Sequence, residues 1–82
     1  MHSVTLYHAQ GCHLCGRVRE TLLRVRKEIP LTLREVDIGG DAALEAVYRE
    51  WLPVVEIDGE RAFVYYLDSA AFLRRIAAQS RA

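Results

Sequence analysis

Two cysteines separated by two residues are the side chains in this sequence with the most evident chemistry. They form the segment Cys12-His13-Leu14-Cys15, and the chain contains no other cysteine. Thiolates attack disulfides and bind soft metal ions. A bridge between two such close residues would restrict the unfolded chain very little, so a purely structural disulfide explains the pair poorly. In a reducing compartment, a close cysteine pair is more often catalytic or metal-binding.

The place of the pair along the chain predicts which sulfur reacts first. Residues 3–8 alternate as in a strand, and helical spacing begins near His13, so Cys12 should lie at the N-terminus of a helix. Unpaired N–H groups and the helix dipole favour an anion there, which lowers the pKa of a thiol. We therefore expect Cys12 to be the nucleophile. Cys15, one turn further on, should be more buried and should act as the resolving thiol.

Three basic side chains near the pair could modify its chemistry. His13 as an imidazolium would stabilise the thiolate of Cys12 and make the pair more oxidising, or it is an exposed histidine with little effect. Arg19 lies one turn after Cys15 on the same helix face and could add positive potential, or it is simply solvated. His8 ends the first strand and could share protons or bind a metal, or it is an ordinary half-buried histidine.

The rest of the pattern predicts a small α/β domain. Pro30 stops the first helix, Asp41 is a good N-cap for the second, and Asp58-Gly59 is a strong hairpin signal. Strands are expected at residues 3–8, 31–38, 54–57 and 61–66, and helices from about residues 13, 41 and 68. The helices should bury Leu14, Val18, Leu22, Val25 and Ile29; Leu44, Val47 and Tyr48; and Phe72, Leu73, Ile76 and Ala77. The order βαβαββα implies a right-handed crossover and a mixed four-stranded sheet flanked by helices.

Length and charge narrow the class of protein. The 82 residues make a single domain, 1–82, and 51% hydrophobic with 27% charged residues is ordinary for a globular chain. The 11 basic and 11 acidic residues balance, which removes the usual electrostatic reason to propose nucleic acid or an anionic membrane as partner. No apolar run is long enough for a membrane span and no secretory signal is evident. We expect a cytoplasmic monomer.

These features together resemble the thioredoxin fold in its smallest form, and glutaredoxin-like proteins most closely. The resemblance covers nearly the whole chain and depends on the Cys-X-X-Cys segment and on Leu52-Pro53-Val54-Val55. It implies that Pro53 is a cis proline packed against the disulfide and that the backbone of Leu52 pairs with the substrate chain. Trp51 would then lie near the rim of the site, or it packs at a helix end. The implied activity is thiol–disulfide exchange.

Two departures from glutaredoxins concern the substrate. His13-Leu14 stands between the cysteines where Pro-Tyr is usual, and Tyr65-Tyr66-Leu67 stands where glutathione-binding members have Gly-Gly. Bulky side chains there would hinder the close backbone approach that glutathione needs. We expect a disulfide-bearing protein or a small thiol compound as substrate, and either glutathione or a reductase as electron source. No resident cofactor is expected.

Two other functions compete with disulfide exchange. Cys12 and Cys15 could bind copper or zinc together with His8 and His13, although small copper chaperones run βαββαβ and a closed zinc site would want a second cysteine pair. The domain could also be a non-catalytic adaptor, because a fold does not imply a function. Thiol–disulfide oxidoreductase is the leading hypothesis.

Overall fold

The computed structural model describes residues 2–79, and its elements follow the predicted order. The strands are β1 (His2–His8), β2 (Leu31–Asp37), β3 (Val54–Ile57) and β4 (Glu60–Val64), and the helices are α1 (His13–Glu28), α2 (Ala42–Tyr48), the short 3-10 helix η1 (Arg49–Trp51) and α3 (Ser69–Gln79). The fourth strand begins one residue earlier than expected and ends at Val64 rather than at Tyr66. Within residues 2–79, none of the helices is both long and apolar enough to cross a membrane.

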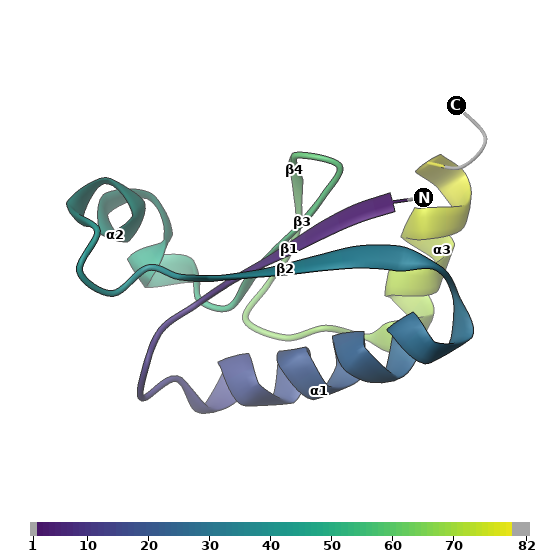
Figure 1. Ribbon diagram of the computed structural model, residues 1–82, viewed down its shortest axis with the longest axis horizontal. Coiled ribbons are helices and arrows are strands. Elements are labelled where there is room, and N and C mark those ends of the chain that lie inside the picture. The colour runs from purple at the N-terminus through teal and green to yellow at the C-terminus, as the bar shows by residue number, and fades with distance from the viewer. Residues whose placement is uncertain (1, 80–82) are drawn as a thin grey trace.

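The four strands form one mixed sheet in the order β2-β1-β3-β4. β1 and β2 are parallel and are joined by α1, whereas β3 runs antiparallel to both β1 and β4. Figure 1 shows α1 running along the sheet, with α3 at one end of the molecule and α2 at the other. The carboxyl ends of β1 and β2 therefore meet at one edge, and the chain passes from this edge into α1.

The core lies between the sheet and the two helices α1 and α3. It is built from Val4, Leu6, Val18, Leu22, Val25, Leu31, Val55, Ile57, Phe72 and Ile76. The predicted apolar faces of α1 and α3 are thus largely confirmed, with two corrections. Leu14 is 42% exposed, because the first turn of α1 faces the segment after β4 instead of the sheet. Ala77 is also exposed.

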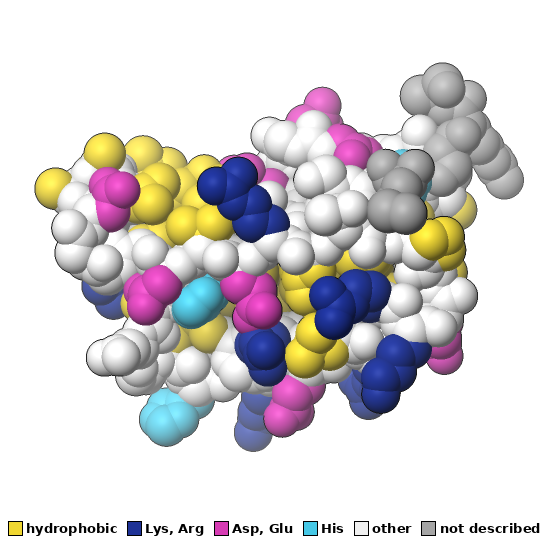
Figure 2. Space-filling view, in the orientation of Figure 1, with side chains coloured by type: hydrophobic (Ala, Val, Ile, Leu, Met, Phe, Trp, Pro, Cys, Tyr) yellow, Lys and Arg dark blue, Asp and Glu magenta, His cyan; other side chains and the backbone are white. Residues whose placement is uncertain are grey.

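The apolar face predicted for α2 is wrong. No residue of α2 is buried, and Val47 is 53% exposed. Hydrophobic side chains are accordingly visible over this helix at the upper left of Figure 2. The ring of Tyr48 instead stacks on Tyr7 of β1 with centroids 3.9 Å apart, and its hydroxyl donates to Glu56 over 2.8 Å. Burial, and after it hydrogen bonding with Tyr7 and Glu56, raises the pKa of Tyr48. The aspartate cap is confirmed, since Asp41 accepts from the N–H of residue 44.

The hairpin between β3 and β4 has the predicted turn. Asp58 and Gly59 have φ values of +51° and +86°, as a type I′ turn requires. The carboxylate of Asp58 also contacts β1, because it accepts hydrogen bonds from the His2 ring at 2.8 Å and from the Ser3 N–H at 2.9 Å. The hydrogen bond from His2 is the main reason why the pKa of Asp58 is lowered. The turn residue thus ties the hairpin to the first strand.

Candidate active site

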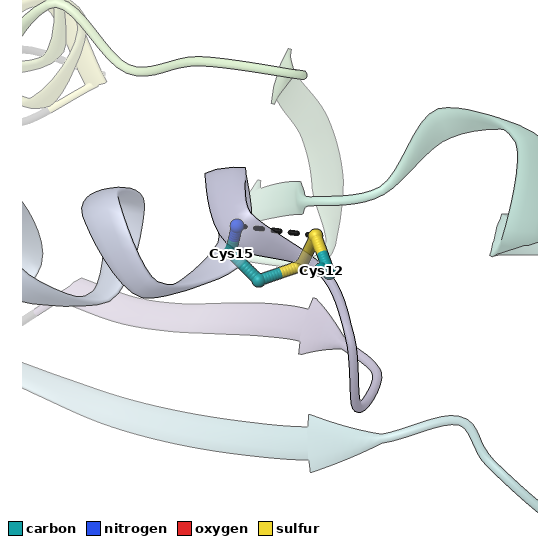
Figure 3. Close-up of a disulfide and its surroundings, with 2 residues drawn as sticks. All are labelled: Cys12 and Cys15. Atoms are coloured by element: carbon teal, nitrogen blue, oxygen red, sulfur yellow. Dashed lines mark hydrogen bonds between the residues drawn. A yellow bond between two sulfur atoms is a disulfide. The ribbon is translucent and has the colours of Figure 1, made fainter.

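The two cysteines form a disulfide at the N-terminus of α1. Their Cα atoms lie 5.3 Å apart, and Cys12 is the N-cap residue of the helix with extended backbone angles. The N–H of Cys15 donates to the sulfur of Cys12 over 3.1 Å, which Figure 3 marks with a dashed line. A helix N-terminus offers unpaired N–H groups to whichever side chain caps it. Here that side chain is the sulfur of Cys12, which accepts one of these N–H groups while it is part of the disulfide.

The two sulfurs differ in their access to solvent. Cys12 is half-buried, whereas Cys15 is only 5% exposed and belongs to the buried face of α1. An attacking molecule can therefore approach Cys12 more easily than Cys15. The sequence predicts this difference in burial, with Cys15 more buried than Cys12.

The segment before β3 brings Pro53 to the same edge of the sheet as Cys12. Tyr7 of β1 pairs with Val54 of β3, so Pro53 lies just beyond the end of β1 from which the chain continues to Cys12. The Leu52–Pro53 peptide bond is cis and Pro53 is fully buried. Leu52 is half-buried and has extended backbone angles, φ −61° and ψ +142°. The cis proline implied by the resemblance is confirmed.

A family model described as a glutaredoxin-like domain (DUF836) matches residues 3–77. The chain belongs to this glutaredoxin-like family. Target protein XcR50 from X. campestris is 31% identical, with a TM-score of 0.77 over 92% of this chain and 96% of that chain. Protein Ne2328 from Nitrosomonas europaea is 25% identical, with a TM-score of 0.77 over 90% and 89%. No curated protein matches the chain significantly.

Structures of thioredoxins confirm the predicted fold of this glutaredoxin-like chain. Chloroplastic thioredoxin z superposes with a TM-score of 0.83 over 100% of this chain and 80% of its own, at 16% identity. At that identity the likeness concerns the fold alone. Together with a cysteine pair at disulfide distance, the thioredoxin fold supports a function of redox type.

Tyr65 is a site residue of this glutaredoxin-like domain that the sequence analysis did not single out. Its N–H donates to the carbonyl of Pro53 over 2.9 Å and its hydroxyl donates to the carbonyl of Glu50 over 3.1 Å. Its ring lies 6.0 Å from the ring of Trp51, centroid to centroid. Tyr65 thus holds both sides of the cis-proline segment. The sequence analysis named Tyr65 only as part of the segment Tyr65-Tyr66-Leu67, without a role at the cis proline.

The backbone of Tyr65 has a conformation that favours glycine. Its φ is +70°, in the left-handed region where residues other than glycine are strained. Neighbouring Trp51, at the end of η1, is 40% exposed and also lies 5.9 Å from the guanidinium carbon of Arg61. Trp51 therefore lies at the surface beside the cis-proline segment and also packs on its neighbours. Its contact with substrate stays a prediction.

The three basic residues that the sequence places near the cysteines, His8, His13 and Arg19, lie in different environments. His13 is exposed in the first turn of α1, and His8 is half-buried with its carbonyl accepting from the N–H of Ile38 over 2.9 Å. Arg19 forms an ion pair with Glu35 of β2, so its charge is already partly neutralised. Influence of His13 or Arg19 on the cysteines stays a prediction. Among residues 2–79, no three His, Cys, Asp or Glu side chains are grouped to hold a metal ion, so the metal-binding alternative gains no support.

Proposed function

We propose that this protein is a thiol–disulfide oxidoreductase in which Cys12 is the nucleophile and Cys15 the resolving thiol. The observation that carries the proposal is the 3.1 Å hydrogen bond from the Cys15 N–H to the Cys12 sulfur. A hydrogen bond to an ionised acceptor is stronger than one to a neutral acceptor, so the contact favours the thiolate of Cys12 over its thiol. The thiolate is the reactive form in disulfide exchange.

The reaction starts from the reduced protein. The Cys12 thiolate attacks one sulfur of the substrate disulfide, and the other substrate sulfur leaves as a thiolate that takes a proton from water. The Cys15 thiol then loses its proton and attacks the Cys12 sulfur of the mixed disulfide. The second substrate sulfur leaves as a thiolate, and the protein ends as the Cys12–Cys15 disulfide. Two electrons pass from the protein to the substrate.

The cis-proline segment would bind the substrate during these steps. Leu52 is extended and half-buried at the same sheet edge as Cys12, which allows its backbone to pair with an extended substrate chain. Pro53 is buried and has no N–H to donate, and its carbonyl already accepts from the N–H of Tyr65, so pairing with substrate falls to the backbone of Leu52. Trp51 would border the bound chain.

The reduced state must be restored by an external thiol. We propose that a reductase, a dithiol protein or glutathione supplies the two electrons and that the protein acts as a monomer in the cytoplasm, without a resident cofactor. A reducing compartment keeps such a pair available as a dithiol between turnovers.

Two cysteine variants test the proposal. The Cys12→Ser protein should not reduce insulin with dithiothreitol as electron donor, because no thiolate remains at the helix cap. The Cys15→Ser protein should accumulate a mixed disulfide with its substrate, visible by mass spectrometry, since nothing resolves it. A Cys12→Ser protein that reduces insulin as fast as the wild type would disprove the proposal. Thiols that fail to exchange with any disulfide would favour the adaptor alternative.

A further inference from the structure

A pocket lies between the start of α1 and the segment that follows β4. Its volume is about 170 Å³. Most of its lining is apolar, with Leu14, Val18, Tyr66 and Leu67 among the lining residues. Leu14 stands between the two cysteines in the sequence, so the pocket begins within the first turn of the helix that carries them. Leu14 and Tyr66 are 42% and 72% exposed, so both present apolar surface to solvent at the pocket.

The only charged residue that lines the pocket is Arg17. Arg24 follows seven residues later, two turns along the same side of α1. Thr21 lies between them, donating its hydroxyl to the carbonyl of Arg17 over 3.1 Å and accepting from Arg24 over 3.4 Å. Neither arginine forms an ion pair within residues 2–79. Both positive charges are therefore available to a visiting molecule.

The opposite side of α1 differs. Arg19 and Arg26 are also seven residues apart, but Arg19 is paired with Glu35 of β2. The whole helix carries five basic and two acidic residues. In Figure 2, dark blue side chains are accordingly frequent along the lower side of the molecule, where α1 lies, with fewer acidic ones among them. In the described part of the chain, Arg17 and Arg24 are thus two unpaired positive charges on the side of the helix that borders the pocket, whereas the other side has Arg26 and Lys27 unpaired and Arg19 paired.

Three acidic residues among those that the structure describes lie near the two arginines, and none forms an ion pair with them. Glu20 is three residues after Arg17 and four before Arg24 on the same helix. Asp68 is beyond Tyr66, where its carboxylate accepts from the N–H of Ala70 over 3.3 Å at the start of α3. Glu28 is at the far end of α1, one turn after Arg24. None of these carboxylates lines the pocket, whose charged lining residue is Arg17.

We propose that this surface binds the polypeptide that exchanges its disulfide with Cys12. This surface consists of the pocket together with Arg17 and Arg24. The segment beside the partner's cysteine would carry a large apolar side chain, which fills the pocket, and acidic residues, which face the two arginines. The inference rests on the proposed function, because a partner is held at this surface only while it reacts with Cys12. Complementary charge of this kind speeds the association of the two partners and fixes how the bound polypeptide is aligned on the surface.

Synthetic peptide disulfides test the inference. Three symmetrical dimers of short peptides are compared, with the central cysteine flanked by Leu and Glu, by Leu and Lys, or by Ser and Glu. Reduced protein reacts with each dimer in a single turnover, giving the protein disulfide and two peptide thiols, and free protein thiols are counted after quenching. Each rate is divided by the rate of dithiothreitol with the same dimer, which removes differences in the intrinsic reactivity of the peptides.

The wild type should react with the Leu–Glu dimer about fivefold faster than with the Leu–Lys dimer, the effect of roughly one exposed ion pair. It should also prefer Leu–Glu to Ser–Glu. R17E should abolish or reverse the charge preference, and R26E, a matched change on the other side of α1, should keep it. Raising the salt concentration should shrink the preference, since screening shortens the range of exposed charges.

The inference is overturned if the normalised rates for the Glu and Lys dimers are equal, if R17E retains the preference, or if R26E removes it equally. A different result disproves the proposed function instead: wild-type protein that exchanges with none of the dimers and not with bis(2-hydroxyethyl) disulfide either. Exchange with that small, neutral disulfide alone contradicts the polypeptide surface and leaves the redox chemistry intact.

Discussion

Replacing Tyr65 by alanine and by glycine should separate the strain of its backbone from the contacts of its side chain. Both variants lose the hydrogen bond to the Glu50 carbonyl and the ring contact with Trp51. Because Tyr65 is 40% exposed, we assign these two contacts together only about 1 kcal/mol, the low end of the usual range. Both variants keep the N–H that donates to Pro53.

The two variants differ in the cost of the left-handed backbone. Alanine at φ +70° retains the strain, whereas glycine adopts this conformation without it, a difference of about 1 kcal/mol. Tyr65→Gly should therefore be nearly as stable as the wild type, and Tyr65→Ala should be less stable than Tyr65→Gly by about 1 kcal/mol. Urea unfolding of the oxidised proteins measures both differences in the free energy of unfolding.

Tyr66 supplies the matched control for this comparison. It is the next residue, is 72% exposed and has no positive φ. There the order should be inverted, with Tyr66→Ala more stable than Tyr66→Gly, because glycine gains only freedom in the unfolded chain. A Tyr65→Ala protein at least as stable as Tyr65→Gly would refute the left-handed conformation. Loosening of the cis-proline segment in Tyr65→Ala should also raise KM for insulin while leaving the rate with a small disulfide unchanged.

Three further outcomes are expected. In Cys15→Ser protein, the N–H of residue 15 should lower the pKa of the Cys12 thiol, giving about tenfold more thiolate at neutral pH than a free thiol has; ultraviolet titration measures this, and an ordinary titration contradicts it. The hydrogen bond from His2 lowers the pKa of Asp58, so its stabilisation is complete above the ordinary aspartate range and is lost as pH falls through the lowered pKa. In Asp58→Asn protein, Tm should therefore fall less steeply as the pH is lowered through the acid range. An unchanged fall of Tm with pH would contradict the role of Asp58. Glutathione should reduce the protein disulfide without saturation and more slowly than dithiothreitol; saturation at low concentration would reveal a glutathione site.

Features fixed by neighbouring residues were predictable from the sequence. Asp58-Gly59 suits a type I′ turn because both positions need positive φ, and the structure has that turn. Asp41 caps α2 and Cys12 caps α1 because a short polar or sulfur-containing side chain there reaches the free N–H groups of the first turn. Each of these features depends on atoms within a few residues of one another. Such features can therefore be predicted from neighbouring residues alone, without knowledge of tertiary contacts.

Features that depend on which layer covers a helix were not predictable. Periodicity showed that Leu44, Val47 and Tyr48 share one face of α2, but it cannot tell whether another element covers that face. In the structure α2 lies at one end of the sheet and is held by the stacking of Tyr48 on Tyr7. The cis form of the proline bond was likewise implied only by the family resemblance, since few X-Pro bonds are cis.

The segment after β4 combines a left-handed backbone position with two bulky tyrosine side chains. Tyr65 retains the left-handed conformation that glycine would adopt freely, and its N–H is bonded to the carbonyl of Pro53. The N–H of Tyr66 is bonded in turn to the carbonyl of Val64 over 2.8 Å. Both amides are therefore occupied, so neither is free to receive the carboxylate of a small ligand such as glutathione. The same tyrosines line the pocket beside Leu14, and we propose that this apolar surface takes a side chain of a polypeptide.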